Sequence, residues 1–218
     1  MILAAGRGER MRPLTDTLPK PLLRVGGKML IEYHLEKLKA ANITEVVINH
    51  AWLGHKIEQA LGDGSSYGLN IQYSPESEAL ETAGGIINAL PLLNNELFVV
   101  INGDIFCDYD YAKLPSSLSG SAHLVLVDNP PQHLHGDFIL TQSGLVEAEG
   151  ENKLTFSGIG VYHSDLFKDY PQGKQALAPI LRSAMQHHQV SGEHYTGIWH
   201  DVGTPDRLRE LDLYLKSN

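Results

Sequence analysis

This 218-residue sequence has only one cysteine, Cys107, so it cannot form a disulfide bond within the chain. A chain without disulfides fits a reducing compartment, and we expect the cytoplasm. No apolar run approaches the roughly 20 residues that a membrane-spanning helix needs, so a membrane partner is not expected. The short apolar start is interrupted at once by Gly6-Arg7-Gly8, which does not resemble a signal peptide.

Positive charge is also scarce, because 17 Lys and Arg residues face 26 Asp and Glu residues, for a net charge of −9. An acidic chain without an extended basic stripe is not typical of nucleic-acid-binding proteins. The 42% content of hydrophobic residues is ordinary for a globular protein, and the length suffices for one large core. We expect a single domain over residues 1–218, and the sequence gives no sign of a protein partner.

The few cations gather at the start of the chain. The first 28 residues carry six cations and two acids, a net charge of +4, while the remaining residues sum to −13. Such a glycine-bearing cationic segment favours a phosphate site, since backbone N–H groups and local charge both attract polyanions. Met11 replaces the third glycine of a Rossmann motif, and no Gly-Lys-Ser/Thr follows as in a P-loop. The alternative is a glycine-rich surface turn with scattered charge.

Strand and helix patterns alternate after this segment. Strands are predicted at 45–49, 69–73 and 97–101, and helices at 28–41, 52–61 and 82–90. This rhythm predicts a three-layer, Rossmann-like α/β fold with a doubly wound, mainly parallel sheet. Ligands of such sheets lie beyond the carboxyl ends of the strands. Residues 1–3 are short for a strand, so we expect native residues upstream of Met1.

Two acidic residues follow predicted strands. Asp104 comes just after the apolar strand 97–101, and Asp201 precedes a helix with Thr204 as its N-cap and Pro205 at its first position. Carboxylates at strand ends suit Mg²⁺, which prefers one or two of them together with substrate phosphates. The alternative for Asp104 is an ordinary Gly-Asp turn, and Asp201 could simply accept backbone hydrogen bonds.

The segment from Leu3 to Lys28 resembles the signature of the sugar-1-phosphate nucleotidyltransferases, which is close to LAAGxGxRMxPLTxxxPKPLLxVxGK. The resemblance implies that a loop wraps a nucleoside triphosphate; it consists of Leu3, Ala4, Ala5, Gly6, Arg7 and Gly8. It also implies that Arg12 contacts the phosphates and that Lys20 lies across the reacting phosphates. The family's "GD" and WxDVGTP motifs imply that Asp104 and Asp201 hold Mg²⁺.

Other segments extend the resemblance. Glu81, Thr82 and Gly84 match the family's nucleobase loop, commonly LGTAG, except that Glu81 replaces a glycine and leaves the identity of the base open. Asn102, Gly136 and Gly158 fall at positions that imply contact with the acceptor sugar phosphate. Glu147, Glu149 and Glu151 could bond sugar hydroxyls, although a solvated charge run is favoured.

The remaining candidates for chemistry carry weaker signals. The candidate histidines have neither a cysteine partner nor an HExxH frame, so zinc is not favoured; they are His133-x-His135, His187-His188, His194 and His200. No motif surrounds Cys107, so a structural role is favoured for its thiol. Asp108-Tyr109-Asp110 has the DxD spacing of some glycosyltransferases but stands beyond the strand end.

The resemblance therefore implies an enzyme that transfers a nucleoside monophosphate to a sugar 1-phosphate, with Mg²⁺ as cofactor and pyrophosphate as second product. It implies UTP as the donor, N-acetylmuramate 1-phosphate as the acceptor and cell-wall recycling as the setting. Alternatives are a mannose-1-phosphate guanylyltransferase, another enzyme of this family, or a noncatalytic regulator that binds a nucleotide sugar. Only a helix is expected after Gly203, so we expect no β-helix extension.

Overall fold

The computed structural model describes residues 1–217; Asn218, the last residue of the predicted domain, lies outside the described residues. The chain folds into two compact units. Unit 1 is assembled from residues 1–80, 102–113 and the segment from 198 onward, and unit 2 from residues 81–101 and 114–197. Each unit therefore combines segments that are far apart in the sequence.

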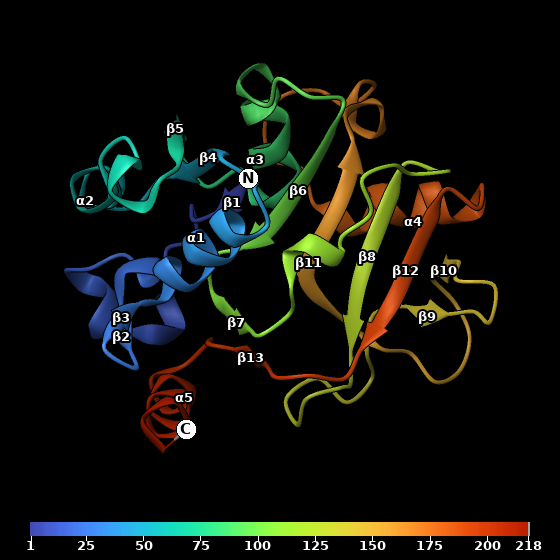
Figure 1. Cartoon of the computed structure of the whole chain (residues 1–218). Helices are drawn as coiled ribbons and strands as arrows, with labels where there is room; N and C mark the ends of the chain where they lie inside the picture. Colours follow the sequence, from blue (N-terminus) through green and yellow to red (C-terminus); the bar gives the residue numbers. More distant parts are fainter. Residues whose placement is uncertain (218) are drawn as a thin grey trace. The chain divides into compact units, whose positions relative to one another are not determined.

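The sheet of unit 1 contains three parallel strands in the order β1 (Ile2–Leu3), β4 (Glu45–His50) and β5 (Asn70–Pro75) (Figure 1). The helix α1 (Leu30–Ala40) precedes β4, and α2 (Gly54–Leu61) connects β4 to β5. Apolar side chains at helical spacing bury one face of α1: Leu30, Ile31, Leu35 and Leu38. The β-branched run in β4 is buried as well, as expected for a central strand.

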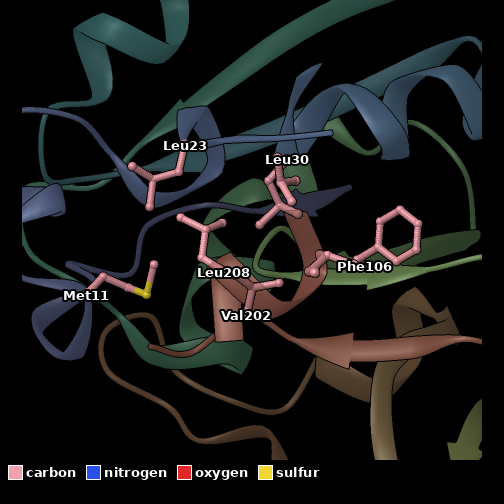
Figure 2. Close-up of a cluster of buried hydrophobic side chains, with 8 residues drawn as sticks. Met11, Leu23, Leu30, Phe106, Val202 and Leu208 are labelled. Atoms are coloured by element: carbon pink, nitrogen blue, oxygen red, sulfur yellow. The ribbon is translucent and has the colours of Figure 1, made fainter. Parts of the chain in front are cut away.

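Two small antiparallel pairs and the last helix complete unit 1. They are β2 (Arg24–Val25) with β3 (Lys28–Met29), β7 (Ile105–Cys107) with β13 (Trp199–Asp201), and α5 (Pro205–Ser217). A buried apolar cluster joins the three chain segments of this unit, and Figure 2 shows side chains of it from each segment. Its members are Met11, Leu23, Val25, Leu30, Phe106, Val202, Leu208 and Leu211.

Unit 2 is built on strands in the order β6 (Leu97–Asn102), β11 (Thr155–His163), β8 (Ala122–Val127) and β12 (Val190–Tyr195) (Figure 1). The long strand β11 runs antiparallel to both of its neighbours, whereas β8 and β12 are parallel. Two helices belong to this unit, α3 (Glu81–Ala89) and α4 (Leu177–Gln186). A short pair, β9 (Ile139–Leu140) and β10 (Val146–Glu147), completes it.

The predicted α/β fold is confirmed, with most strand and helix bounds shifted by one or two residues. The helix predicted from residue 52 begins at Gly54, because Leu53 takes a left-handed backbone conformation with φ of 54°. A Cβ at position 54 would lie 1.9 Å from Nδ1 of His50, so only glycine fits there. None of the helices within residues 1–217 has the length and apolar character to cross a membrane.

A buried polar network fixes the carboxyl ends of the strands in unit 1. Asn49, at the end of β4, accepts a hydrogen bond from the backbone N–H of Ala4 (2.9 Å) and donates one to Oε1 of Glu76 (2.7 Å). The other oxygen of Glu76 accepts from the N–H of Leu80 (2.9 Å). One amide and one carboxylate thus connect the segments that leave β1, β4 and β5, because each buried polar group requires a partner.

Replacing Asn49 should therefore destabilise the protein. Asn49→Ala leaves the N–H of Ala4 and the Glu76 carboxylate without their buried partner, and each such group costs about 1–3 kcal/mol. We expect the free energy of unfolding, measured by urea titration, to fall by about 2 kcal/mol or more. Asn70→Ala removes an exposed bond to Glu45 and should stay within about 0.5 kcal/mol of the wild type. Equal losses in the two variants would contradict this view.

Stability should also fall at mildly acidic pH because of His34 on α1. Its Nδ1 lies 2.8 Å from the hydroxyl of Tyr111, and burial lowers the pKa of His34 from 6.5 to about 4. Below pH 6.5 the unfolded chain takes up a proton at this position that the folded chain does not take up until about pH 4. Stability is therefore lost as the pH falls through this window, by about 2 kcal/mol between pH 7 and pH 5.

The measurement is urea unfolding of the wild type and of His34→Gln at several pH values between 5 and 7. The variant should be less stable at pH 7 and should lack this part of the pH dependence, so the two curves converge as the pH falls. Parallel curves would show that His34 is not the group responsible.

Candidate active site

The glycine loop of residues 3–8 is fixed on one side by its own packing. Gly8 has φ of 66°, and its carbonyl accepts bonds from the hydroxyl of Thr15 (2.7 Å) and the N–H of Met11 (2.9 Å). A Cβ at position 8 would lie 2.9 Å from Cγ2 of Thr15, so glycine is required there. At Gly6, by contrast, a Cβ would meet nothing within 4 Å, and φ is not left-handed. Neither the packing nor the backbone explains a glycine at position 6.

The arginines of this segment are exposed. The guanidinium carbon of Arg7 lies 4.8 Å from the ring centroid of Trp52, whose Nε1 donates to the carbonyl of Thr15 (3.1 Å). Arg12 forms an ion pair with Asp16, with 3.1 Å between Nε and Oδ1. Positive charge on this loop is thus presented to solvent, where a polyanion could approach it.

Lys20 is buried at the start of a 3-10 turn (Lys20–Leu22) that follows Pro19, with only 7% of the residue exposed. Its Nζ lies 2.7 Å from Oδ2 of Asp104. A buried ammonium group needs such a partner, since an unpaired charge is costly to remove from water. The structure thus brings together two of the predicted site residues that are far apart in the chain.

Asp104 is held close to the glycine loop by the residue before it. The N–H of Gly103 donates to the carbonyl of Leu3 (2.9 Å), and a Cβ at position 103 would lie 2.7 Å from that oxygen. Only glycine allows this close approach of two backbones. In the Gly-Asp sequence after β6, the close backbone contact therefore explains the glycine, while the predicted chemistry concerns the aspartate.

Asp201 is brought beside Asp104 by the pairing of β13 with β7. Asp201 stands opposite Ile105, and the N–H of Val202 donates to the carbonyl of Asp104 (3.0 Å). The carboxylate of Asp201 forms an ion pair with Arg207 on α5. Both predicted metal ligands thus lie on neighbouring backbone segments, and each is paired with a side-chain cation.

This donor set fits Mg²⁺ supplied with a phosphate ligand. Two carboxylates of hard oxygen type are present, at 40% and 27% side-chain exposure for Asp104 and Asp201. Within residues 1–217 no group of three or more His, Cys, Asp or Glu side chains is arranged to hold a metal ion. A cation here would take its other ligands from water and phosphate, as Mg²⁺ commonly does.

The other predicted residues lie in unit 2, except Asn102, which ends β6 and belongs to unit 1. Glu81 has φ of 60°, so the backbone explains why a glycine would be favoured at this position. Thr82 follows it in α3, and the N–H of Gly84 donates to the carbonyl of Gln175 (3.0 Å). Holding a glutamate in this conformation is the kind of strain that occurs at binding loops.

Gly136 and Gly158, the two acceptor-side glycines, also have positive φ, of 60° and 84°. A Cβ on Gly136 would lie 2.7 Å from the carbonyl oxygen of Lys153. Gly158 falls where the register between β11 and β8 shifts, at an irregularity between Phe156 and Ile159. Backbone geometry by itself thus accounts for both glycines, and contact of either with a sugar stays a prediction.

The other acidic residues that the sequence suggested form local contacts. Oδ1 of Asp108 accepts from the N–H of Ile198 (2.7 Å), and Oδ1 of Asp110 accepts from the N–H of Ala112 (3.0 Å). Glu149 has a largely exposed side chain, 3.8 Å from Nζ of Lys153. These contacts are those of loop and surface carboxylates.

Cys107 and the histidines have local partners. Burial raises the pKa of the Cys107 thiol to about 11, which disfavours the reactive thiolate. Nε2 of His133 lies 3.0 Å from Oδ1 of Asp137, and Nε2 of His194 lies 2.9 Å from Oδ1 of Asp128. Each of these two imidazoles contacts one carboxylate, as surface histidines often do.

Three residues of this region escaped the sequence reasoning, namely Asn49, Glu76 and Arg207. Asn49 ends a predicted strand, and Glu76 follows another, so both occupy strand ends where ligands are expected. Arg207 follows the N-cap Thr204 by three residues, and its side chain turns back toward Asp201. Only the position at the strand ends could have drawn attention to the first two.

Known proteins place this arrangement in a family. An N-acetylmuramate alpha-1-phosphate uridylyltransferase from Neisseria meningitidis serogroup B is 57% identical, over 96% of this chain and 95% of its own length. A mannose-1-phosphate guanyltransferase from Schizosaccharomyces pombe is 30% identical, over 100% of this chain and 64% of its own length.

The fold is shared with a solved structure as well. The crystal structure of a putative glucose-1-phosphate thymidylyltransferase from Bacillus anthracis superposes with a TM-score of 0.86 at 23% identity, covering 100% of this chain and 94% of that one. The family model for nucleotidyl transferases matches residues 1–218. The chain belongs to the nucleotidyl transferase family.

Proposed function

We propose that this protein transfers UMP from UTP to N-acetylmuramate 1-phosphate, giving a nucleotide sugar and pyrophosphate. The choice of substrates is supported by the 57% identity to the Neisseria uridylyltransferase, which extends over almost the whole of both chains. The reaction type is supported by one observation above all, the pairing of buried Lys20 with Asp104 beside the glycine loop. We assign the reaction to peptidoglycan recycling in the cytoplasm, the reducing compartment that a single free thiol fits.

The chemistry requires charge neutralisation more than proton transfer. An oxygen of the sugar phosphate attacks the α-phosphorus of UTP, and the bond from that phosphorus to the oxygen bridging to the β-phosphate breaks. The nucleophile is already an anion, so no general base is needed. Two polyanions must be held in line, and fixed cations stabilise the charge that develops.

The residues of unit 1 can meet these needs. Lys20 would lie between the α-phosphate and the sugar phosphate, while Arg12 and the backbone of the glycine loop would hold the β- and γ-phosphates. Gly6 supports this use of the loop, because close approach of a phosphate gives a reason for glycine that packing does not. Asp104 and Asp201 would hold Mg²⁺, which neutralises phosphate charge when bound.

The remaining predicted residues have roles of their own in the proposal. In unit 2, Glu81, Thr82 and Gly84 would contact the base, and Gly136 and Gly158 would contact the acceptor. In unit 1, Asn102 at the end of β6 would contact the acceptor. The strained φ of Glu81 supports a binding role for this turn.

The test of the reaction is pyrophosphate release with Mg²⁺ for UTP, GTP, dTTP and CTP, each combined with several sugar 1-phosphates. Turnover with UTP and N-acetylmuramate 1-phosphate alone supports the full proposal. Turnover with GTP and mannose 1-phosphate keeps the mechanism and replaces the substrates. A second assay supplies a UDP-sugar together with an acceptor alcohol. Release of free UDP from that donor would indicate a glycosyltransferase, and binding of the UDP-sugar without turnover in either assay would indicate a noncatalytic regulator.

Lys20 should matter more for turnover than for affinity. Lys20→Ala removes a cation from the reacting phosphates, and loss of one such preorganised group costs about 10²–10³ in kcat. We expect the KM for UTP to change much less, because the glycine loop and Arg12 remain. Steady-state kinetics measures both constants.

Lys168→Ala is the matched control, since this lysine is exposed and pairs with Asp165 on the surface of unit 2. Its kcat should equal that of the wild type. A folded Lys20→Ala protein with unchanged kcat would remove Lys20 from the reaction.

A further inference from the structure

Arg207, in the first turn of α5, forms hydrogen bonds with Asp201 and with Thr204. Its Nη1 donates to the carboxylate of Asp201 and to the backbone carbonyl of the same residue (3.1 Å). Its Nε donates to the hydroxyl of Thr204 (3.4 Å). The side chain is only 20% exposed, so this guanidinium is held at the site by three acceptors and is not a loose surface charge.

Arg209 on the same helix shows what a surface pair looks like here. It pairs with Asp206 one turn away along α5, and about three quarters of each side chain is exposed. Such exposed ion pairs contribute little to stability, and this one connects two residues of the same helix. Arg207 instead turns back to Asp201 in β13. This contact is not the i, i+3 or i, i+4 pairing that neighbouring residues of one helix form.

Gly203 lies against the guanidinium of Arg207. A Cβ at this position would lie 2.8 Å from Nη2 of Arg207 and 3.2 Å from Oδ1 of Asp201. The φ of Gly203 is not left-handed, so its backbone conformation does not demand glycine. The glycine of the Asp-Val-Gly sequence therefore makes room for the contact between Arg207 and Asp201.

Each proposed metal ligand thus has its own internal cation. Lys20 pairs with Asp104, and Arg207 pairs with Asp201. These two carboxylates and two cations sum to zero formal charge. A free divalent cation gains little from a neutral site and is repelled by a fixed positive charge, whereas a triphosphate brings negative charge with it.

We infer that Lys20 and Arg207 neutralise Asp104 and Asp201 before substrate arrives, so that this site takes up a divalent cation together with the nucleoside triphosphate and not by itself. The inference rests on the proposed function, in which these two carboxylates are metal ligands. The pairing of Lys20 has a further consequence. If Asp104 held a cation, Nζ of Lys20 would lose its carboxylate partner and would be available to a phosphate.

The experiment measures Mn²⁺ binding to the purified protein by electron paramagnetic resonance, without nucleotide and with α,β-methylene-UTP, which resists transfer. The wild type should bind free Mn²⁺ weakly and bind it much more tightly with the nucleotide analogue present. Removing one neutralising charge in Arg207→Gln should tighten the binding of free Mn²⁺ by roughly ten-fold or more. Arg209→Gln is the matched control and should bind Mn²⁺ like the wild type.

Two further results separate this inference from the proposed function. Asp201→Asn should weaken Mn²⁺ binding with the nucleotide; if it does not, Asp201 is no metal ligand, and the metal assignment itself fails. If Asp201 matters but Arg207→Gln leaves free Mn²⁺ binding unchanged or weaker, the inference of charge neutralisation is wrong. Melting temperatures of all variants, measured without metal, show whether each protein is folded.

Discussion

The site in unit 1 depends on a strand of only two residues. β1 is short, yet its end is fixed by hydrogen bonds to two different partners. The N–H of Ala4 donates to the side-chain oxygen of Asn49, and the carbonyl of Leu3 accepts from the N–H of Gly103. The second contact leaves no room for a side chain at position 103. These bonds set the glycine loop against the Gly-Asp turn, so Asp104 and the loop keep a fixed relation.

Electrostatics builds on this frame. The carboxylate of Asp104 compensates the buried charge of Lys20. Asp201 lies in β13, which pairs with β7 directly after Asp104, and its carboxylate forms an ion pair with Arg207. The arginines of the loop remain exposed and are held by lighter contacts, such as the ring of Trp52. The two carboxylates thus have paired cations, while the arginines of the loop are exposed to solvent, where they can attract polyanionic substrates.

Much of this could be read from the sequence, and the reasons for the rest are physical. Hydrophobic periodicity located the main helices and strands between residues 28 and 101, and the motif positions of Lys20, Asp104 and Asp201 came from family resemblance. Periodicity does not report the direction of a strand, so antiparallel β11 was not foreseen. The bonds of Asn49 with Glu76 and of Arg207 with Asp201 depend on three-dimensional proximity, for which the chain carries no local signal.

At Glu81 the sequence shows an unusual residue but does not show its conformation. The sequence revealed a departure from the family's glycine, but only the structure revealed that the backbone there is left-handed. Glutamate is strained in this left-handed conformation, which glycine adopts without strain. The surrounding structure therefore overrides the backbone preference of Glu81.

The division of unit 1 among three chain segments has a consequence for biosynthesis. Met11, Leu23 and Leu30 emerge early from the ribosome, whereas Val202, Leu208 and Leu211, which complete the same core, emerge among the last residues of the described chain. Until then the cluster lacks these three members, and apolar side chains of the early segment that they cover in the folded unit are exposed. A nascent chain of this kind completes one of its apolar clusters late and meanwhile exposes surface of the type that chaperones shield.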